Sequence, residues 1–431
     1  MERHQRQKTH TSKAALLATV ALLCLGLVPG ATADGGHGND TDRKARFLYI
    51  WAGDQARQAP DFLAVVDFDE DSDAYGTVIN IAPIPPPFNV GNEPHHCNLS
   101  ADKNILACGG LLSLLQGQGG IFFFDVSEAG SPRLLFSANA PLSSVTDDFL
   151  PLSDGGFLVT RMGSASGGVP GRVVEFDRYL QLVHEWPDVP PLDGFNPHGI
   201  SARPELNLMV TSDFINPATT LNGFPGDPVL RGSIRVWDLA SRTITKTISI
   251  PTAVGTMDVK MIPGDPLGRA FTAGMFDGLV YLIDPAAGTA SVVFDCENIV
   301  PHVVVPVRGG MTQILAMPQS GDRLIFASFQ AGQVGMLDVG DPLHPVQSGI
   351  VNLGVETGPH YIALTNDDKR LVVADYFLNE DDFGKIHFEG DHKVHVVKVH
   401  RNKLELDQRF QLDFNTAFVT GPARPHGFAM K

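Results

Sequence analysis

Residues 94–108 read PHHCNLSADKNILAC, which is an apolar run, a polar turn and a second apolar run. Turn-forming residues between two β-rich runs are the signature of a β-hairpin. A unit that recurs along a chain at this scale predicts a repeat architecture. The same pattern returns at 146–160 (TDDFLPLSDGGFLVT), 197–211 (PHGISARPELNLMVT), 256–272 (TMDVKMIPGDPLGRAFT), 311–327 (MTQILAMPQSGDRLIFA) and 359–374 (PHYIALTNDDKRLVVA).

A third β run follows each hairpin and ends in aspartate before a turn. Along the chain it reads LAVVDF, IFFFDV, VVEFDR, IRVWDL, VYLIDP and VGMLDV. A fourth run, such as YGTVINI or RTITKTISI, comes next. Four strands in each repeat make the blade of a β-propeller, so we predict an all-β chain of that class.

The two ends of the repeat region complete one blade. The chain ends in RPHGFAMK, which matches an inner-strand motif, and FLYIWAGD at 47–54 matches the second strand of the same hairpin. A last blade closed by strands from both ends leaves fewer open sheet edges. We therefore predict seven blades, with six blades and an irregular insertion as the alternative.

The first 33 residues have the pattern of a secretory signal peptide. Basic residues within 3–13 precede an apolar run at 14–28, and Ala31-Thr32-Ala33 is a small-residue cleavage site. We expect a signal peptide at 1–33, a disordered linker at 34–45 and one propeller domain at 46–431. The protein would be periplasmic or secreted, with no membrane insertion after cleavage. The alternative is a retained N-terminal anchor.

Charge and cysteine content narrow the chemistry further. The formal net charge of −16 disfavours nucleic acid and anionic membranes as partners. Cys97, Cys108 and Cys296 remain after the signal, and no CxxC occurs, which makes a thiolate zinc site improbable. Cys97 and Cys108 share one predicted hairpin, so they either form a disulfide or stay as free buried thiols.

Histidine occupies the start of the inner strand in four of the seven repeats. Each of these histidines follows a proline, and the chain has more Pro-His pairs than chance pairing of 15 histidines with 31 prolines would give. Inner strands of different blades meet beside the central channel, so these side chains can converge on one point. The residues at the seven motif starts are His95, Asp148, His198, Met257, Thr312, His360 and His426.

Imidazoles that converge without thiolates suit copper, iron or zinc, and a set of four favours a redox metal. We therefore predict that His95, His198, His360 and His426 bind a metal. The alternative is a purely structural role, in which each histidine only hydrogen-bonds a neighbouring blade. His96 is a possible fifth ligand, although alternation along a strand would point it away from His95.

Three further residues are candidates around this centre. Asp148 is the candidate catalytic residue, as polar partner or base. Phe214 and Tyr376 end second strands, where they would line the substrate site. His302 precedes its hairpin, and we expect it in a loop.

The chain also resembles the family of selenium-binding proteins and methanethiol oxidases. The resemblance rests on YIWAGDQ, PDFLAVVDFDEDSDAYGTVIN, EPHHCN, LMVTSDFINPAT, GSIRVWDL, GPHYIALTNDDKRLVVADY and GPARPHGF, and covers most of the chain after the signal. It implies a seven-bladed propeller and a copper-dependent oxidase, with His95 and His96 in the site. The family's reactive cysteine is Gly76 here, which excludes selenium or thiol chemistry by that residue. A histidine-containing segment of the family's second blade is also missing, since 141–149 reads PLSSVTDDF.

Together these observations predict an exported, copper-dependent oxidase or oxygenase that uses dioxygen on a small organic molecule. One alternative is an iron-dependent enzyme like the carotenoid and stilbene cleavage oxygenases, which also hold a metal with four histidines in a propeller. Another is a non-catalytic propeller that serves as a binding scaffold. A calcium-dependent lactonase would need acidic ligands at the axis, and only one motif start is acidic.

Overall fold

The computed structural model describes residues 44–431, apart from 224–225, 251–254 and 301–306. The predicted signal peptide, most of the predicted linker and His302 lie outside the described residues. Within the described part, the only helices are short 3-10 turns, and none is long and apolar enough to cross a membrane. These turns are η2 (Ser113–Gln116), η3 (Pro204–Leu206), η4 (Pro217–Thr219), η5 (Cys296–Asn298), η6 (Arg308–Gly310) and η7 (Asp381–Phe383).

Among the described residues, seven antiparallel sheets correspond to the seven predicted blades, and a two-stranded hairpin forms an eighth sheet. The first three blades consist of β4 (Pro94–Leu99), β5 (Ile105–Gly110), β6 (Ile121–Asp125) and β7 (Arg133–Ala138); β8 (Ser143–Pro151), β9 (Phe157–Ser164), β10 (Arg172–Phe176) and β11 (Leu182–Trp186); and β12 (Pro197–Arg203), β13 (Leu208–Ile215), β14 (Leu230–Asp238) and β15 (Thr243–Ser249).

The next three blades follow the same order. They consist of β16 (Thr256–Met261), β17 (Ala270–Gly274), β18 (Leu279–Asp284) and β19 (Thr289–Asp295); β20 (Thr312–Ala316), β21 (Arg323–Ser328), β22 (Gln333–Asp338) and β23 (Val346–Asn352); and β24 (Tyr361–Leu364), β25 (Arg370–Ala374), β28 (Lys393–His400), β29 (Lys403–Leu406) and β30 (Leu412–Asp413). An inserted hairpin of β26 (Leu378–Asn379) and β27 (His387–Phe388) leaves the sixth blade between β25 and β28.

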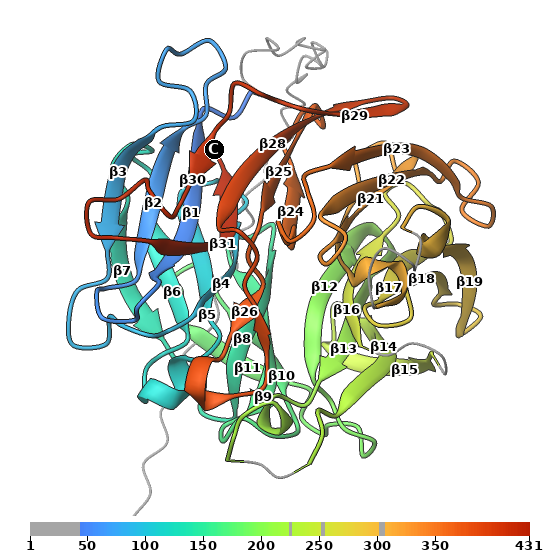
Figure 1. Ribbon diagram of the computed structural model, residues 1–431. Coiled ribbons are helices and arrows are strands. Elements are labelled where there is room, and N and C mark those ends of the chain that lie inside the picture. The colour runs from blue at the N-terminus through green and yellow to red at the C-terminus, as the bar shows by residue number, and fades with distance from the viewer. Residues whose placement is uncertain (1–43, 224–225, 251–254, 301–306) are drawn as a thin grey trace, which may run out of the picture. The chain divides into compact units, whose positions relative to one another are not determined.

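The seventh blade joins the two ends of the repeat region. It has the order β3 (Val78–Pro83), β2 (Phe62–Asp67), β1 (Phe47–Asp54) and β31 (Ala423–Met430). In Figure 1 the red strand β31 lies beside the blue strand β1, and the two pair antiparallel. This confirms the predicted mixed blade.

The inner strands close into a ring. In chain order, each of β4, β8, β12, β16, β20 and β24 contacts the next, β24 contacts β31, and β31 contacts β4. The chain is therefore the predicted seven-bladed β-propeller.

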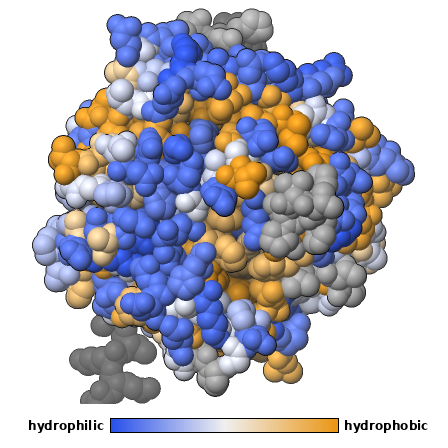
Figure 2. All heavy atoms as spheres, viewed as in Figure 1, coloured by the Kyte–Doolittle hydropathy of each residue, from blue (hydrophilic) through white to orange (hydrophobic). Residues whose placement is uncertain are grey.

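Apolar side chains fill the spaces between neighbouring sheets. Between the seventh and first blades, for example, Trp51 packs against Phe122 and Phe124, and its indole nitrogen donates to the carbonyl of Gly109 at 2.7 Å. Figure 2 shows mostly hydrophilic residues on one outer face, with apolar patches between them. The inner strands are thus held by packing on both sides, which gives a rigid frame to the side chains at their starts.

Candidate metal centre of axial histidines

Two adjacent histidines at the start of β4 face the same way. The pairing of β4 with β5 shifts register between Pro94 and Cys97, which is a β-bulge. The rings of His95 and His96 stack with centroids 4.2 Å apart and planes 15° apart. The expectation that alternation would point His96 away was wrong, because the bulge interrupts the alternation.

All five predicted histidine ligands meet in one buried cluster. The ring centroid of His426 lies 4.1 Å from that of His95 and 4.8 Å from that of His360, and the ring of His198 lies 5.6 Å from that of His96. Each of the five side chains is at most 2% exposed. The cluster therefore combines four strand starts that are far apart in the sequence.

Asp147 is the acidic member of this cluster, and the sequence analysis missed it. Its Oδ2 atom lies 3.0 Å from Nε2 of His95, and Oδ1 lies 3.2 Å from Nδ1 of His96 and 3.1 Å from Nδ1 of His198. Burial by itself would raise the pKa of this carboxyl, but the surrounding histidines hold it well below its usual range. A carboxylate with no solvent exposure is thus kept ionised beside three imidazoles.

The neighbouring residue, Asp148, lies outside the histidine cluster. β8 shifts register between Thr146 and Phe149, and Asp147, not the Asp148 of the repeat alignment, contacts the histidines. The Asp148 carboxylate accepts from the backbone N–H of Ile200 at 3.3 Å, which ties the second blade to the third. Burial raises the pKa of Asp148 to about 6. Its catalytic role stays a prediction.

Burial keeps four of the five imidazoles neutral, and several ring nitrogens of the cluster lack hydrogen bonds. Burial lowers the pKa of His96 to about 3 and that of His198 to about 4, and it holds the pKa values of His360 and His426 well below the usual range. Nδ1 of His360 lies 2.5 Å from Oε1 of Gln313, which leaves its Nε2 available.

Several ring nitrogens have no hydrogen-bond partner among the residues that the structure describes. They include Nδ1 of His95, Nε2 of His360 and both nitrogens of His426. A buried polar atom without a partner costs about 1–3 kcal/mol of stability, so several such nitrogens in one place require a bound partner to offset that cost. Within the described chain, the ligand atoms of His95, His96 and His426 lie within 4.8 Å of one another, as do those of His95, Asp147 and His198. Imidazole nitrogens that lack hydrogen-bond partners and lie close together fit a bound transition metal.

A buried charged network supports two of the histidine strands. The Glu93 carboxylate pairs with Arg424 at 3.0 Å and with Arg57 at 2.8 Å, and it also accepts from the hydroxyl of Tyr376. Glu93 and Arg424 directly precede the Pro-His pairs that contain His95 and His426. The network therefore fixes both strand starts, and neither Glu93 nor Arg424 was predicted from the sequence.

The two predicted substrate-lining residues have different surroundings. The ring of Phe214 lies 5.1 Å from that of His198 and forms part of an apolar cavity wall. The ring of Tyr376 lies 5.8 Å from that of His426, but its hydroxyl is engaged by Glu93 and it belongs to the wall of neither cavity described below.

Two cavities of different character reach the histidines. The larger, about 610 Å³, runs from His96 and His198 past Asp148, Asp258 and Lys260 to the turns of the inner hairpins. The smaller, about 40 Å³, touches His95 and His198 from the other side and has almost entirely apolar walls. The cluster therefore lies between a wide channel with mixed polar and apolar walls and a small apolar chamber.

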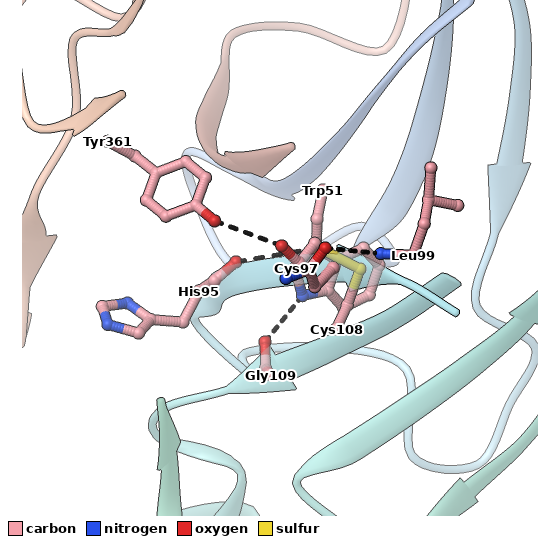
Figure 3. Close-up of a disulfide and its surroundings, with 8 residues drawn as sticks. Trp51, His95, Cys97, Leu99, Cys108, Gly109 and Tyr361 are labelled. Atoms are coloured by element: carbon pink, nitrogen blue, oxygen red, sulfur yellow. Dashed lines mark hydrogen bonds between the residues drawn. A yellow bond between two sulfur atoms is a disulfide. The ribbon is translucent and has the colours of Figure 1, made fainter. Parts of the chain in front are cut away.

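A disulfide anchors the strand that carries the paired histidines (Figure 3). Cys97, directly after His96, is bonded to Cys108 on the paired strand β5. The hydroxyl of Tyr361 donates to the carbonyl oxygen of Cys97 at 3.1 Å, and its ring stacks on that of His96 at 4.4 Å. Of the two states that the sequence allowed for these cysteines, the structure has the disulfide.

These features define the class of protein: a seven-bladed propeller with a buried cluster of histidines at its axis. The family model described as "56kDa selenium binding protein (SBP56)" matches residues 144–431. The chain belongs to that family, which confirms the resemblance seen in the sequence.

Individual relatives agree with this assignment. The chain is 24% identical to a human protein named methanethiol oxidase, over 86% of this chain and 89% of the relative, and 24% identical to a methanethiol oxidase of Ruegeria pomeroyi, over 88% of each. A crystal structure described as a hypothetical selenium-binding protein from Sulfolobus tokodaii superposes with a TM-score of 0.74 at 18% identity, covering 90% of this chain and 94% of the other. The last comparison supports the fold alone.

Proposed function

We propose that this protein is an exported, metal-dependent oxidase or oxygenase that acts on a small organic molecule, with copper held by the axial histidines. The observation that carries the proposal is the concentration of five buried imidazoles in one cluster. Two relatives named methanethiol oxidase support oxidation of a small molecule as the reaction class. The single-electron chemistry with dioxygen would come from the bound copper.

The residues of the chain would have distinct roles around the metal. All five histidines would hold the metal: ligand atoms of His95, His96 and His426 lie within 4.8 Å of one another, and the rings of His198 and His360 lie beside them. Asp147 and Gln313 lie at nitrogens of His95 and His360 and would fix their tautomers, so that the opposite nitrogen faces the metal.

Iron is the second candidate metal, and Asp147 is the observation that favours it. A carboxylate among imidazoles is typical of non-haem iron oxygenases. A site made of imidazoles alone suits copper as well as iron. Ligand atoms of His95, Asp147 and His198 lie within 4.8 Å of one another. If Asp147 coordinates directly, the centre would resemble an iron site more than a copper site.

Export is the remaining part of the proposal, and it rests on the sequence at 1–33. Basic residues, a short apolar run and Ala31-Thr32-Ala33 have the order of a cleaved signal. Sequencing the N-terminus of the mature protein tests this: we expect a start near Asp34, and an intact Met1 would contradict export.

Metal analysis of protein purified from its native host tests the function. We expect near-stoichiometric copper, and near-stoichiometric iron would support the second candidate. Protein without transition metal would support the non-catalytic scaffold instead. In His198→Ala and His360→Ala the metal content should fall, and unchanged content in both variants would overturn the proposed ligand set.

A further inference from the structure

The small chamber beside the histidine cluster has walls from four blades. The turn after β5, the segment after β13 and the inserted hairpin of the sixth blade each form part of its wall. Met162 of β9, Phe214 of β13 and Leu378 of β26 line it and are each 4% exposed. Its volume of about 40 Å³ equals about three water-sized sites.

The polar groups in the wall are already satisfied. The hydroxyl of Thr220 donates to Oε1 of Glu380 at 2.6 Å, and Oε2 of Glu380 accepts from the backbone N–H of Lys385 at 2.9 Å. Apart from His95 and His198, the described wall residues thus offer a ligand little besides hydrocarbon and aromatic surface. Apolar cavities of this kind stay dry and bind small apolar molecules.

The closing hairpin is fastened to the third blade. The backbone N–H of Lys385 donates to the carbonyl of Thr220 at 2.8 Å, that of Asn222 donates to the carbonyl of Phe383 at 2.7 Å, and Leu221 bridges Gly384. The inserted hairpin is therefore held against the third blade at this side of the chamber.

We propose that this chamber is a binding site for a small uncharged molecule of about two to four heavy atoms, which it delivers to the face of the cluster formed by His95 and His198. Charged and strongly hydrated species reach the cluster from the opposite side, through the channel lined by Asp258 and Lys260. The delivery step rests on the proposed function, but binding in the chamber does not need the metal. Dioxygen and a small organic substrate are both small and uncharged, so either could occupy the chamber.

Xenon is the probe for the chamber, because it needs an apolar pocket and no metal. In crystals of the full chain under xenon pressure, we expect one ordered xenon atom between Met162, Phe214 and Leu378. Hydrogen-bonded water in the chamber, or xenon bound only elsewhere in the crystal, would overturn the proposal.

Leu114→Phe should fill the chamber from the partly buried turn η2 and abolish the xenon site. The matched control is Leu142→Phe, at a side chain that is 54% exposed and lies outside the chamber wall; it should leave the xenon site intact. Full xenon occupancy in Leu114→Phe would contradict the assigned location. Equal melting temperatures of the two variants show that any loss is not caused by unfolding.

Kinetics of the metal-loaded enzyme distinguish the two sources of ligand. If the organic substrate occupies the chamber, Leu114→Phe raises its KM on the order of tenfold and leaves the KM for dioxygen unchanged. The reverse pattern identifies dioxygen as the occupant. If neither KM changes although xenon binds, the chamber exists but does not feed the reaction, and the delivery step is wrong. An inactive protein that still binds xenon would instead count against the proposed function.

Discussion

The Asp147 carboxylate lies 3.0 Å from Nε2 of His95, at the centre of a cluster in which both residues are almost completely buried. An ionised carboxylate can only accept, so this imidazole nitrogen carries the proton, and in the neutral ring the opposite nitrogen, Nδ1, keeps its lone pair. One hydrogen bond thus determines which atom of His95 a metal can use.

Asp147→Asn tests this relationship. The amide keeps the shape but removes the charge, so we expect metal affinity to fall by about 10–100-fold, as for other groups that orient metal-bound histidines. Metal titration of the dialysed protein measures the affinity. The matched control is Asp148→Asn, one residue away and outside the histidine cluster, which should retain metal; equal loss in both variants would contradict the special role of Asp147.

The buried histidines predict an acid-sensitive metal-free protein. Burial lowers the pKa of His96 to about 3 and that of His198 to about 4, below the value near 6.5 of the unfolded chain. The unfolded state therefore binds more protons, and stability falls as pH drops from about 6.5 towards 4, by about 1.4 kcal/mol per pH unit for each histidine. Urea unfolding of the metal-free protein at several pH values measures the slope.

His198→Gln provides the comparison for that slope. Because glutamine does not titrate, the variant should lose about 1.4 kcal/mol per pH unit of the dependence above pH 4. An identical slope in the variant and the wild-type protein would mean that His198 is not held neutral by burial.

The disulfide should contribute measurably to stability. Cys97 and Cys108 are 11 residues apart, and closing a loop of that length stabilises a protein by about 3 kcal/mol in the chain-entropy description. We expect the double variant Cys97→Ser/Cys108→Ser to lose about that free energy of unfolding in denaturant titrations. A reducing agent should lower the stability of the wild-type protein and leave the double variant unchanged; sensitivity of the double variant would point to another cause.

The buried Glu93 is expected to be costly to neutralise. Glu93→Gln leaves Arg424 and Arg57 without their shared carboxylate, and loss of one partner from a buried ion pair costs about 3–5 kcal/mol. Asp381→Asn is the control, since this carboxylate also pairs with Arg57 but is 39% exposed and should contribute less than about 1 kcal/mol. Similar losses in both variants would contradict the difference in burial.

The fold and most of the site could be predicted because repetition makes them visible. Hairpin motifs recur in each blade, and the Pro-His pairs mark equivalent positions beside the axis. These patterns give His95, His198, His360 and His426 without knowledge of any contact. The mixed blade followed from the two chain ends in the same way.

The remaining residues depend on local backbone irregularities that leave no sequence pattern. Bulges in β4 and β8 turn His96 and Asp147 into the cluster. Strict alternation along a strand would instead point His96 away from it, and the repeat alignment places Asp148 at the equivalent position of the second blade. The pairing of Glu93 with Arg424 joins two distant parts of the chain. The sequence did contain one signal for this pairing: Glu93 and Arg424, which have opposite charges, each directly precede a Pro-His pair.

The most direct test of the central claim is anomalous X-ray diffraction at the copper and iron absorption edges, from crystals of protein purified from its native host. We predict a single strong peak within about 2.0–2.2 Å of nitrogen atoms of the axial histidines. Fully occupied crystals should lose that peak when the metal is removed by a chelator. Absence of any anomalous peak among the axial histidines would contradict the account.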